Sequence, residues 1–242
     1  MTLALVAVWC FVVAVAGGTV GLVLGNIRLP VLVLAASSPA AGAGANIGIS
    51  GVSALTSAVV HVRARRIDWR LFAWLTPPSV LGAVAGGYLS GKVPKDVFLA
   101  TIGVALLLMA IDVLRPKPPV RPRRMTPLET IGIGGAIGLL GGFVGLILGS
   151  LRLPALLRMG EPLAAAIGTN MTVGFFVGAA GVFGHVPGGV DWTLLLVGAA
   201  ASVPGALLGA RLTGRLPEER LKQAIGGILV VAGIAMLVQA LA

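Results

Sequence analysis

Eight long stretches of this 242-residue sequence contain no charged residue. A helix that crosses a bilayer needs about 20 mostly apolar residues. Charged residues make up 11% of the chain, whereas a soluble domain carries about a quarter. The chain is therefore predicted to be an all-α integral membrane protein with eight transmembrane helices. The uncharged stretches are residues 1–27, 29–62, 71–91, 97–111, 130–151, 163–190, 192–210 and 223–242.

The first two stretches differ from simple spanning segments. No Lys or Arg precedes the first apolar run, so it lacks the positive region of a signal peptide and is expected to stay in the mature protein. The second stretch is too long for one helix and contains Pro30 and Pro39. It is predicted to form a short non-spanning piece followed by a helix from about Ala43 to His61.

One phrase of fourteen residues is written twice in the chain. GGTVGLVLGNIRLP occupies residues 17–30 and GGFVGLILGSLRLP occupies residues 141–154, with ten identical positions. The same spacing of 124 residues aligns Asn46 with Asn170. A fixed internal period indicates a duplicated unit.

The duplication divides the chain into two homologous four-helix repeats, residues 1–114 and 127–242, joined by a basic, Pro-rich linker at 115–126. Because four crossings return the chain to the side where it started, both repeats are expected to insert in the same orientation. A two-fold axis along the membrane normal would then relate them. Transporters built from repeats hold their substrate at the interface between the repeats.

The net charge of +10 is concentrated in short loops. Residues 63–70 and the linker together hold half of the Lys and Arg residues, and short loops rich in these residues stay in the cytoplasm. We therefore expect a lipid bilayer as the partner and no nucleic acid, with the linker and both termini in the cytoplasm. On this scheme the basic segment 211–222 would lie outside, against the same rule.

Glycine recurs at every fourth position of both copies of the phrase, which would line one helix face and let another backbone approach closely. Both copies end where Gly, Arg and Pro coincide with the end of the apolar run. This combination is expected for broken or re-entrant helices, whose exposed amides suit an anion. The glycines are Gly17, Gly21 and Gly25 in the first copy and Gly141, Gly145 and Gly149 in the second.

These features resemble the TauE/SafE family. The resemblance rests on the Gly-rich first helix ending in RLP, GTN at residues 168–170, the H…(V/I)DW turn and LP before the last helix. The first repeat departs from the pattern with GAN at 44–46. The resemblance implies a multi-pass protein of the prokaryotic inner membrane. Its implied function is secondary transport of a small sulfur-containing oxyanion such as sulfite, thiosulfate or an organosulfonate.

The candidate substrate ligands are polar side chains and helix ends near the repeated phrase. An uncharged amide can donate hydrogen bonds to an anion without the desolvation cost of a buried cation, and Arg recognises oxyanions through two donors. Helix packing and snorkelling of Arg at helix ends are the alternatives. The candidates are Asn46, Asn170, Thr169, Ser50, Thr172, Gly25, Gly149, Arg28 and Arg152.

Other functions find less support. The eight acidic residues all fall at or near segment ends, which favours an anion over a cation as cargo. No convincing nucleophile, metal set or acid/base pair indicates an enzyme, and Cys10 with His61 and His185 offers no metal site or cofactor. An anion channel and a carrier for a small carboxylate are the alternative functions. Proton coupling and a homodimer are left open.

Overall fold

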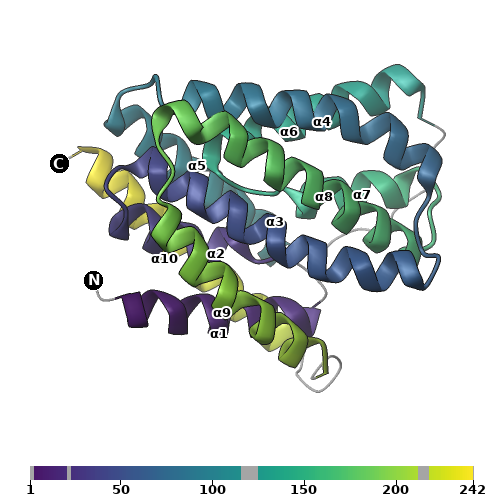
Figure 1. Cartoon of the computed structure of the whole chain (residues 1–242), viewed down its shortest axis with the longest axis horizontal. Coiled ribbons are helices and arrows are strands. Elements are labelled where there is room, and N and C mark those ends of the chain that lie inside the picture. Colours follow the sequence, from purple (N-terminus) through teal and green to yellow (C-terminus); the bar gives the residue numbers. More distant parts are fainter. Residues whose placement is uncertain (1–2, 21–22, 116–124, 212–217, 242) are drawn as a thin grey trace.

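The computed structural model of the chain describes residues 3–20, 23–115, 125–211 and 218–241. The described residues form ten α-helices and one 3-10 turn (Figure 1), which confirms the all-helical prediction. In chain order these are α1 (Leu3–Val20), α2 (Gly25–Ala35), α3 (Pro39–Arg63), α4 (Trp69–Ser90), α5 (Lys95–Leu114), α6 (Pro127–Val144), α7 (Gly149–Arg158), α8 (Leu163–His185), η1 (Val186–Gly188), α9 (Trp192–Arg211) and α10 (Glu218–Leu241).

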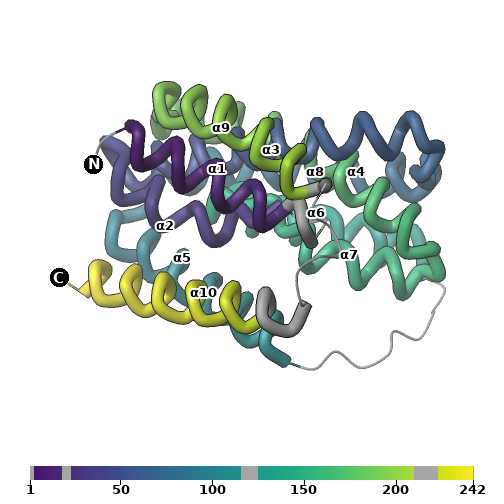
Figure 2. Tube along the Cα trace, turned by 90° about the horizontal axis from the view of Figure 1, so that it is seen from below, coloured from purple at the N-terminus to yellow at the C-terminus, as the bar shows by residue number. Residues whose placement is uncertain are grey.

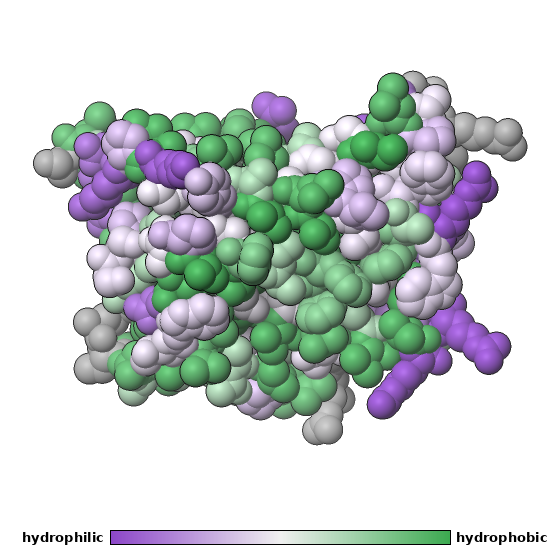
Figure 3. Space-filling view, turned by 45° about the horizontal axis from the view of Figure 1, so that its top comes forward, coloured by the Kyte–Doolittle hydropathy of each residue, from purple (hydrophilic) through white to green (hydrophobic). Residues whose placement is uncertain are grey.

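Six of the described helices are long and apolar enough to cross a bilayer: α3, α5, α6, α8 with η1, α9 and α10. The chain is thus a multi-pass membrane protein. The two other predicted segments form α1 and α4, which do not meet these limits in the part of the chain that the structure describes, so the count of eight is not confirmed. Figure 3 shows apolar side chains across the middle of one face, as expected for contact with lipid.

The repeated phrase contains a helix break. In the second copy, α6 ends at Val144, Gly145 adopts a left-handed conformation (φ 80°) and α7 begins at Gly149. The prediction that the spaced glycines of this copy share one helix face is therefore wrong. In the first copy, α2 begins at Gly25, while Gly21 lies outside the described residues.

The short non-spanning piece predicted before the second long helix is α2, but the boundaries differ. It begins at Gly25, inside the first predicted stretch. The long helix that follows starts at Pro39 instead of about Ala43, because the Ser38 side chain accepts a hydrogen bond from the Ala41 amide and caps the helix.

Corresponding helices of the two halves run antiparallel. Along the contact between α3 and α8, Gly44 meets His185 and Gly51 meets Gly178. Along the contact between α5 and α10, Gly103 meets Leu237 and Leu114 meets Gly226 in the same antiparallel register. The prediction that both repeats insert in the same orientation is therefore wrong.

The helix breaks explain this inversion. After its break, α2 turns back beside α1 towards the end of the bundle where the chain starts (Figure 2). The pair α1 and α2 therefore makes no net crossing, and α3, α4 and α5 add an odd number. The pair α6 and α7 does the same from the opposite end.

Both described termini lie at one end of the bundle, which we call the terminal end (Figure 1). The opposite end, the linker end, carries the end of α5, since Leu114 packs beside Gly226 near the start of α10. The expectation that the linker shares a side with the termini is therefore wrong. Linker residues 116–124 themselves lie outside the described part of the chain.

Helices α3 and α8 cross the middle of the bundle (Figure 1). Small residues bring them together: a Cβ atom added to Gly51 would lie 3.1 Å from the Cα atom of Gly178. Close packing of this kind holds membrane helices together where the hydrophobic effect cannot. The adjoining turn of α3 is buried throughout residues 41–51, and it faces the two helix breaks.

Candidate functional site

The two short helices begin inside the protein without a side-chain cap. The residues before them, Leu24 and Leu148, have nearly the same backbone conformation, with φ and ψ of −87° and 46° and of −72° and 50°. Both leucines are buried and neither makes a side-chain cap, although in α2 the Ile27 amide donates to Asn26 Oδ1 at 3.0 Å. A helix start presents amide donors and the positive end of the helix dipole. Leucine is a poor cap, and the positive end of each helix dipole favours negative charge nearby.

The guanidinium group of Arg28, in the first turn of α2, is only 2% exposed. Its Nε atom donates to Asn46 Oδ1 at 2.9 Å, and its Nη2 atom donates to Ser50 Oγ at 2.7 Å and to the Asn46 carbonyl at 3.4 Å. The Nη1 atom donates to Ser202 Oγ on α9 at 3.4 Å. Every nitrogen of this group is therefore bonded.

Asn46 joins the broken helices of both halves. Its Nδ2 atom donates to the carbonyl of Gly25 at 3.1 Å and to the carbonyl of Gly145 at 2.9 Å. The first carbonyl begins α2 and the second lies in the break between α6 and α7. The two breaks therefore meet at this amide, in the interior of the bundle.

The second half repeats this arrangement. Arg152, in the first turn of α7, is fully buried (0% exposed), and its Nη1 atom donates to Asn170 Oδ1 at 3.3 Å. Asn170 Nδ2 donates to the carbonyl of Gly149 at 3.2 Å. Each half thus places an arginine of the short helix, an asparagine of the next helix and the first carbonyl of the short helix in one cluster.

These clusters hold buried positive charge. None of the hydrogen bonds made by Arg28 or Arg152 within the described residues reaches a carboxylate. Buried charges in proteins are normally paired, and ionisable groups at membrane depth mark substrate or ion pathways. The arrangement is suited to binding an anion.

Comparison with known proteins identifies the family of this chain. The family profile described as sulfite exporter TauE/SafE matches residues 6–236, nearly the whole chain. The chain belongs to the TauE/SafE family. The resemblance noted from the sequence motifs is thereby confirmed.

Among its relatives in the TauE/SafE family, "Probable membrane transporter protein YjnA" of Bacillus subtilis is 27% identical over 255 residues, which cover 98% of this chain and 100% of the relative. A "Probable membrane transporter protein" of Haemophilus influenzae is 25% identical over 207 residues, covering 79% of this chain and 77% of the relative. No solved structure matches the chain.

The hydroxyl candidates of this TauE/SafE protein are bonded within the protein. Thr169 accepts a hydrogen bond from the Asp68 amide at 2.9 Å, and Thr172 donates to the Gly168 carbonyl at 2.9 Å. Of the three predicted hydroxyls, the structure brings only Ser50 to the arginine clusters.

Sequence reasoning missed two members of the first cluster. The Gly145 carbonyl can accept the hydrogen bond from Asn46 because α6 ends there. The regular spacing of the glycines gave no sign of this helix end. Ser202 lies far away in the sequence, but it aligns with Ser79 at the spacing of 123 residues that relates the later parts of the repeats. A search for matched polar residues within the apolar stretches would have found it.

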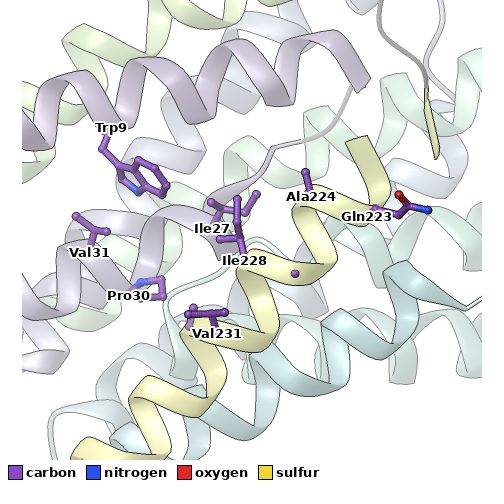
Figure 4. Close-up of a pocket in the computed structure, with 10 residues that line it drawn as sticks. Trp9, Ile27, Pro30, Val31, Gln223, Ala224, Ile228 and Val231 are labelled. Carbon is purple, nitrogen blue, oxygen red and sulfur yellow. The ribbon is translucent and has the colours of Figure 1, made fainter. Parts of the chain in front are cut away.

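The groove shown in Figure 4 is a separate feature of this TauE/SafE protein. It lies between α10 and the pair α1 and α2, with a volume of about 510 Å³, and its lining includes Trp9, Ile27, Val31 and Ile228. This lining is mostly apolar and suits lipid or another apolar group better than an anion. The groove lies on the face of α2 that carries Ile27 and Val31, whereas Arg28 is buried against α3.

Proposed function

We propose that this protein is a secondary transporter that moves a small sulfur-containing oxyanion across the prokaryotic inner membrane by alternating access. Membership of the TauE/SafE family supports transport. The observation that carries the choice of an anion is the pair of buried arginines, each at an uncapped helix start and neither bonded to a carboxylate among the described residues.

Burial of both arginines favours a carrier over a channel. Arg28 and Arg152 are 2% and 0% exposed, so an anion reaches them only after the helices around them move. Inverted repeats with broken helices at mid-membrane are the architecture in which such rocking alternates access between the two sides. Asn46, which bonds to both breaks, lies where the halves would move against each other.

We also propose that the linker end faces the cytoplasm and that both termini face outside. Fourteen of the eighteen Lys and Arg residues lie in, or within a few residues of, sequence segments that join helices at the linker end, whereas only Lys92 and Lys95 have such a place at the terminal end. This arrangement places segment 211–222 on the same side as the other basic loops and satisfies the rule for positive loops. The fourteen residues are Arg63, Arg65, Arg66, Arg70, Arg115, Lys117, Arg121, Arg123, Arg124, Arg158, Arg211, Arg215, Arg220 and Lys222.

Counterflow tests the proposed function. Proteoliposomes are loaded with unlabelled sulfite, diluted into a trace of radiolabelled sulfite, and assayed for transient accumulation of label. A carrier exchanges and accumulates label, whereas a channel lets it equilibrate without overshoot. Loading with acetate in place of sulfite tests the alternative of a carboxylate carrier. The variant Arg28→Gln/Arg152→Gln should abolish the overshoot, and Gly132→Ala, at a position with open space around it, should retain it.

A further inference from the structure

The two arginine clusters differ along one edge of the guanidinium group. In Arg28, the Nε and Nη2 atoms donate to Asn46 Oδ1 at 2.9 Å and to Ser50 Oγ at 2.7 Å. The N–H groups of these two nitrogens point the same way and can bind two oxygens at once. We call this pair of donors the fork. Two oxygens of the protein fill this fork in the first half.

The same fork is empty in the second half. The Nε and Nη2 atoms of Arg152 have no hydrogen-bond partner among the residues that the structure describes, although the side chain is fully buried. Asn170 Oδ1 bonds to Nη1 instead, at 3.3 Å. Buried donors without partners carry a desolvation cost that a native structure rarely leaves uncompensated.

One residue of the sequence accounts for part of the difference. The spacing of 124 residues aligns Ser50 with Gly174, so α8 has no hydroxyl where α3 supplies one. A Cβ atom added to Gly174 would lie 3.2 Å from Ile147 Cγ2 and 3.5 Å from Ala54 Cβ. A small side chain therefore fits there with a slight adjustment of Ile147.

We propose that the Nε–Nη2 fork of Arg152 binds two oxygens of the transported anion, whereas the fork of Arg28 is filled by the protein and holds α2 to α3. The proposal rests on the transport of an oxyanion put forward above and assigns substrate contact to the second half. The uncapped start of α7, in whose first turn Arg152 lies, adds a favourable dipole. The fork matches sulfite, a sulfonate or a carboxylate, each of which carries two or more oxygens on one atom, whereas a halide offers a single acceptor atom to both donors.

The internal repeat suggests a test in which a single hydroxyl group is added to the second half. Gly174→Ser introduces the side chain that fills the fork in the first half, and Gly174→Ala adds the same Cβ atom without the oxygen. We expect Gly174→Ser to weaken binding of radiolabelled sulfite at least about tenfold, the effect of losing a hydrogen bond to a charged group. Gly174→Ala should change it less than about threefold. Binding is measured on purified protein in nanodiscs, with melting temperature as the check of folding.

Arg152→Lys tests the same proposal independently, because it keeps the positive charge and removes the Nε–Nη2 fork. We expect it to weaken sulfite binding at least about tenfold and to abolish competition by methanesulfonate, with no competition by chloride in the parent. Ser50→Ala, the matched change in the first half, should lower the melting temperature, because it removes a hydroxyl that holds α2 to α3.

The outcomes separate the two proposals. If the parent binds sulfite and the folded variants Gly174→Ser and Arg152→Lys bind it equally well, the fork of Arg152 is not the site, while oxyanion transport stands. If only one of the two variants folds, the sulfite affinity of that variant alone tests the assignment of the Arg152 fork. If the parent binds none of sulfite, thiosulfate, methanesulfonate and acetate, the proposed function is wrong and the assignment of Arg152 falls with it.

Discussion

The side-chain amide of Asn46 lies 2.9 Å from the carbonyl oxygen of Gly145, so a residue of the first half holds the helix break of the second. The same nitrogen also bonds to Gly25, at the start of α2. A movement that separates the two halves must break or exchange one of these bonds. Under the proposed alternating access, Asn46 would couple the two broken helices.

Removing this amide should cost more stability than removing its counterpart. Asn46→Ala leaves two buried carbonyls and the Nε atom of Arg28 without their partner, whereas Asn170→Ala frees one described carbonyl and one nitrogen. With about 1–3 kcal/mol for each unsatisfied group, we expect the lower melting temperature for Asn46→Ala. Sulfite affinity should fall at least about tenfold in Asn170→Ala, because the amide of Asn170 bonds to Arg152. Equal melting temperatures would show that the bridge to Gly145 contributes little.

The start of α7 should not tolerate a side chain. A Cβ atom on Gly149 would lie 2.9 Å from Asn170 Nδ2, so Gly149→Ala must displace the amide that orients Arg152. We expect at least about a tenfold loss of sulfite counterflow. Gly227→Ala, with nothing within 4 Å of the added atom, is the matched control and should transport like the parent. Normal counterflow by Gly149→Ala would place the substrate elsewhere.

The proposed orientation predicts which cysteines can be labelled from outside. In a Cys10→Ser background, Lys92→Cys at the terminal end should react with an impermeant maleimide added to intact cells. Arg65→Cys at the linker end should react only after the cells are opened. Both residues are exposed in the structure. If Arg65→Cys reacts in intact cells and Lys92→Cys does not, the proposed orientation is wrong and the termini lie in the cytoplasm.

A pair of carboxyl groups at the linker end should make stability depend on pH. Partial burial, and then the negative charge and hydrogen bond of Asp68, raise the pKa of Glu161. The folded state therefore holds the Glu161 proton more tightly than the unfolded state, so this group favours folding at low pH. That contribution is lost as pH rises from the unfolded pKa, about 4.3, through the raised folded pKa.

Glu161→Gln should accordingly raise the melting temperature at pH 7 and leave it unchanged below about pH 4. The measurement is thermal unfolding of the purified protein in detergent across this range. A variant that melts below the parent at pH 7 would mean that the Glu161 carboxylate makes a favourable contact there instead.

The sequence predicted the membrane class and the all-helical fold because these depend on local composition. Arg28 with Asn46, and Arg152 with Asn170, were recognised by their matching positions in the repeats. The orientation of the halves was missed because α1 and the start of α2 lie within one uncharged stretch. Nothing in its composition shows where the chain reverses.

The difference between the two forks also depends on the folded structure. The alignment of Ser50 with Gly174 is visible in the sequence. Its meaning appears only when Ser50 is seen at 2.7 Å from Arg28 and the corresponding nitrogen of Arg152 is seen without a described partner. Thr169 and Thr172 were predicted on the same grounds of polarity and position, and their local bonds to backbone atoms could not be foreseen.

The antiparallel contact of α3 with α8 has a consequence for ancestry. A single ancestral half, inserted into the membrane in both directions, would build this bundle from two identical chains, so duplication had only to join partners that already fitted. Fusion then requires the copies to hold opposite orientations, and their loops have diverged to match: RARRIDWR at 63–70 carries four arginines, while its counterpart VPGGVDWT at 186–193 carries no basic residue. In the proposed orientation, the charge difference between these two loops would hold each copy in its own direction.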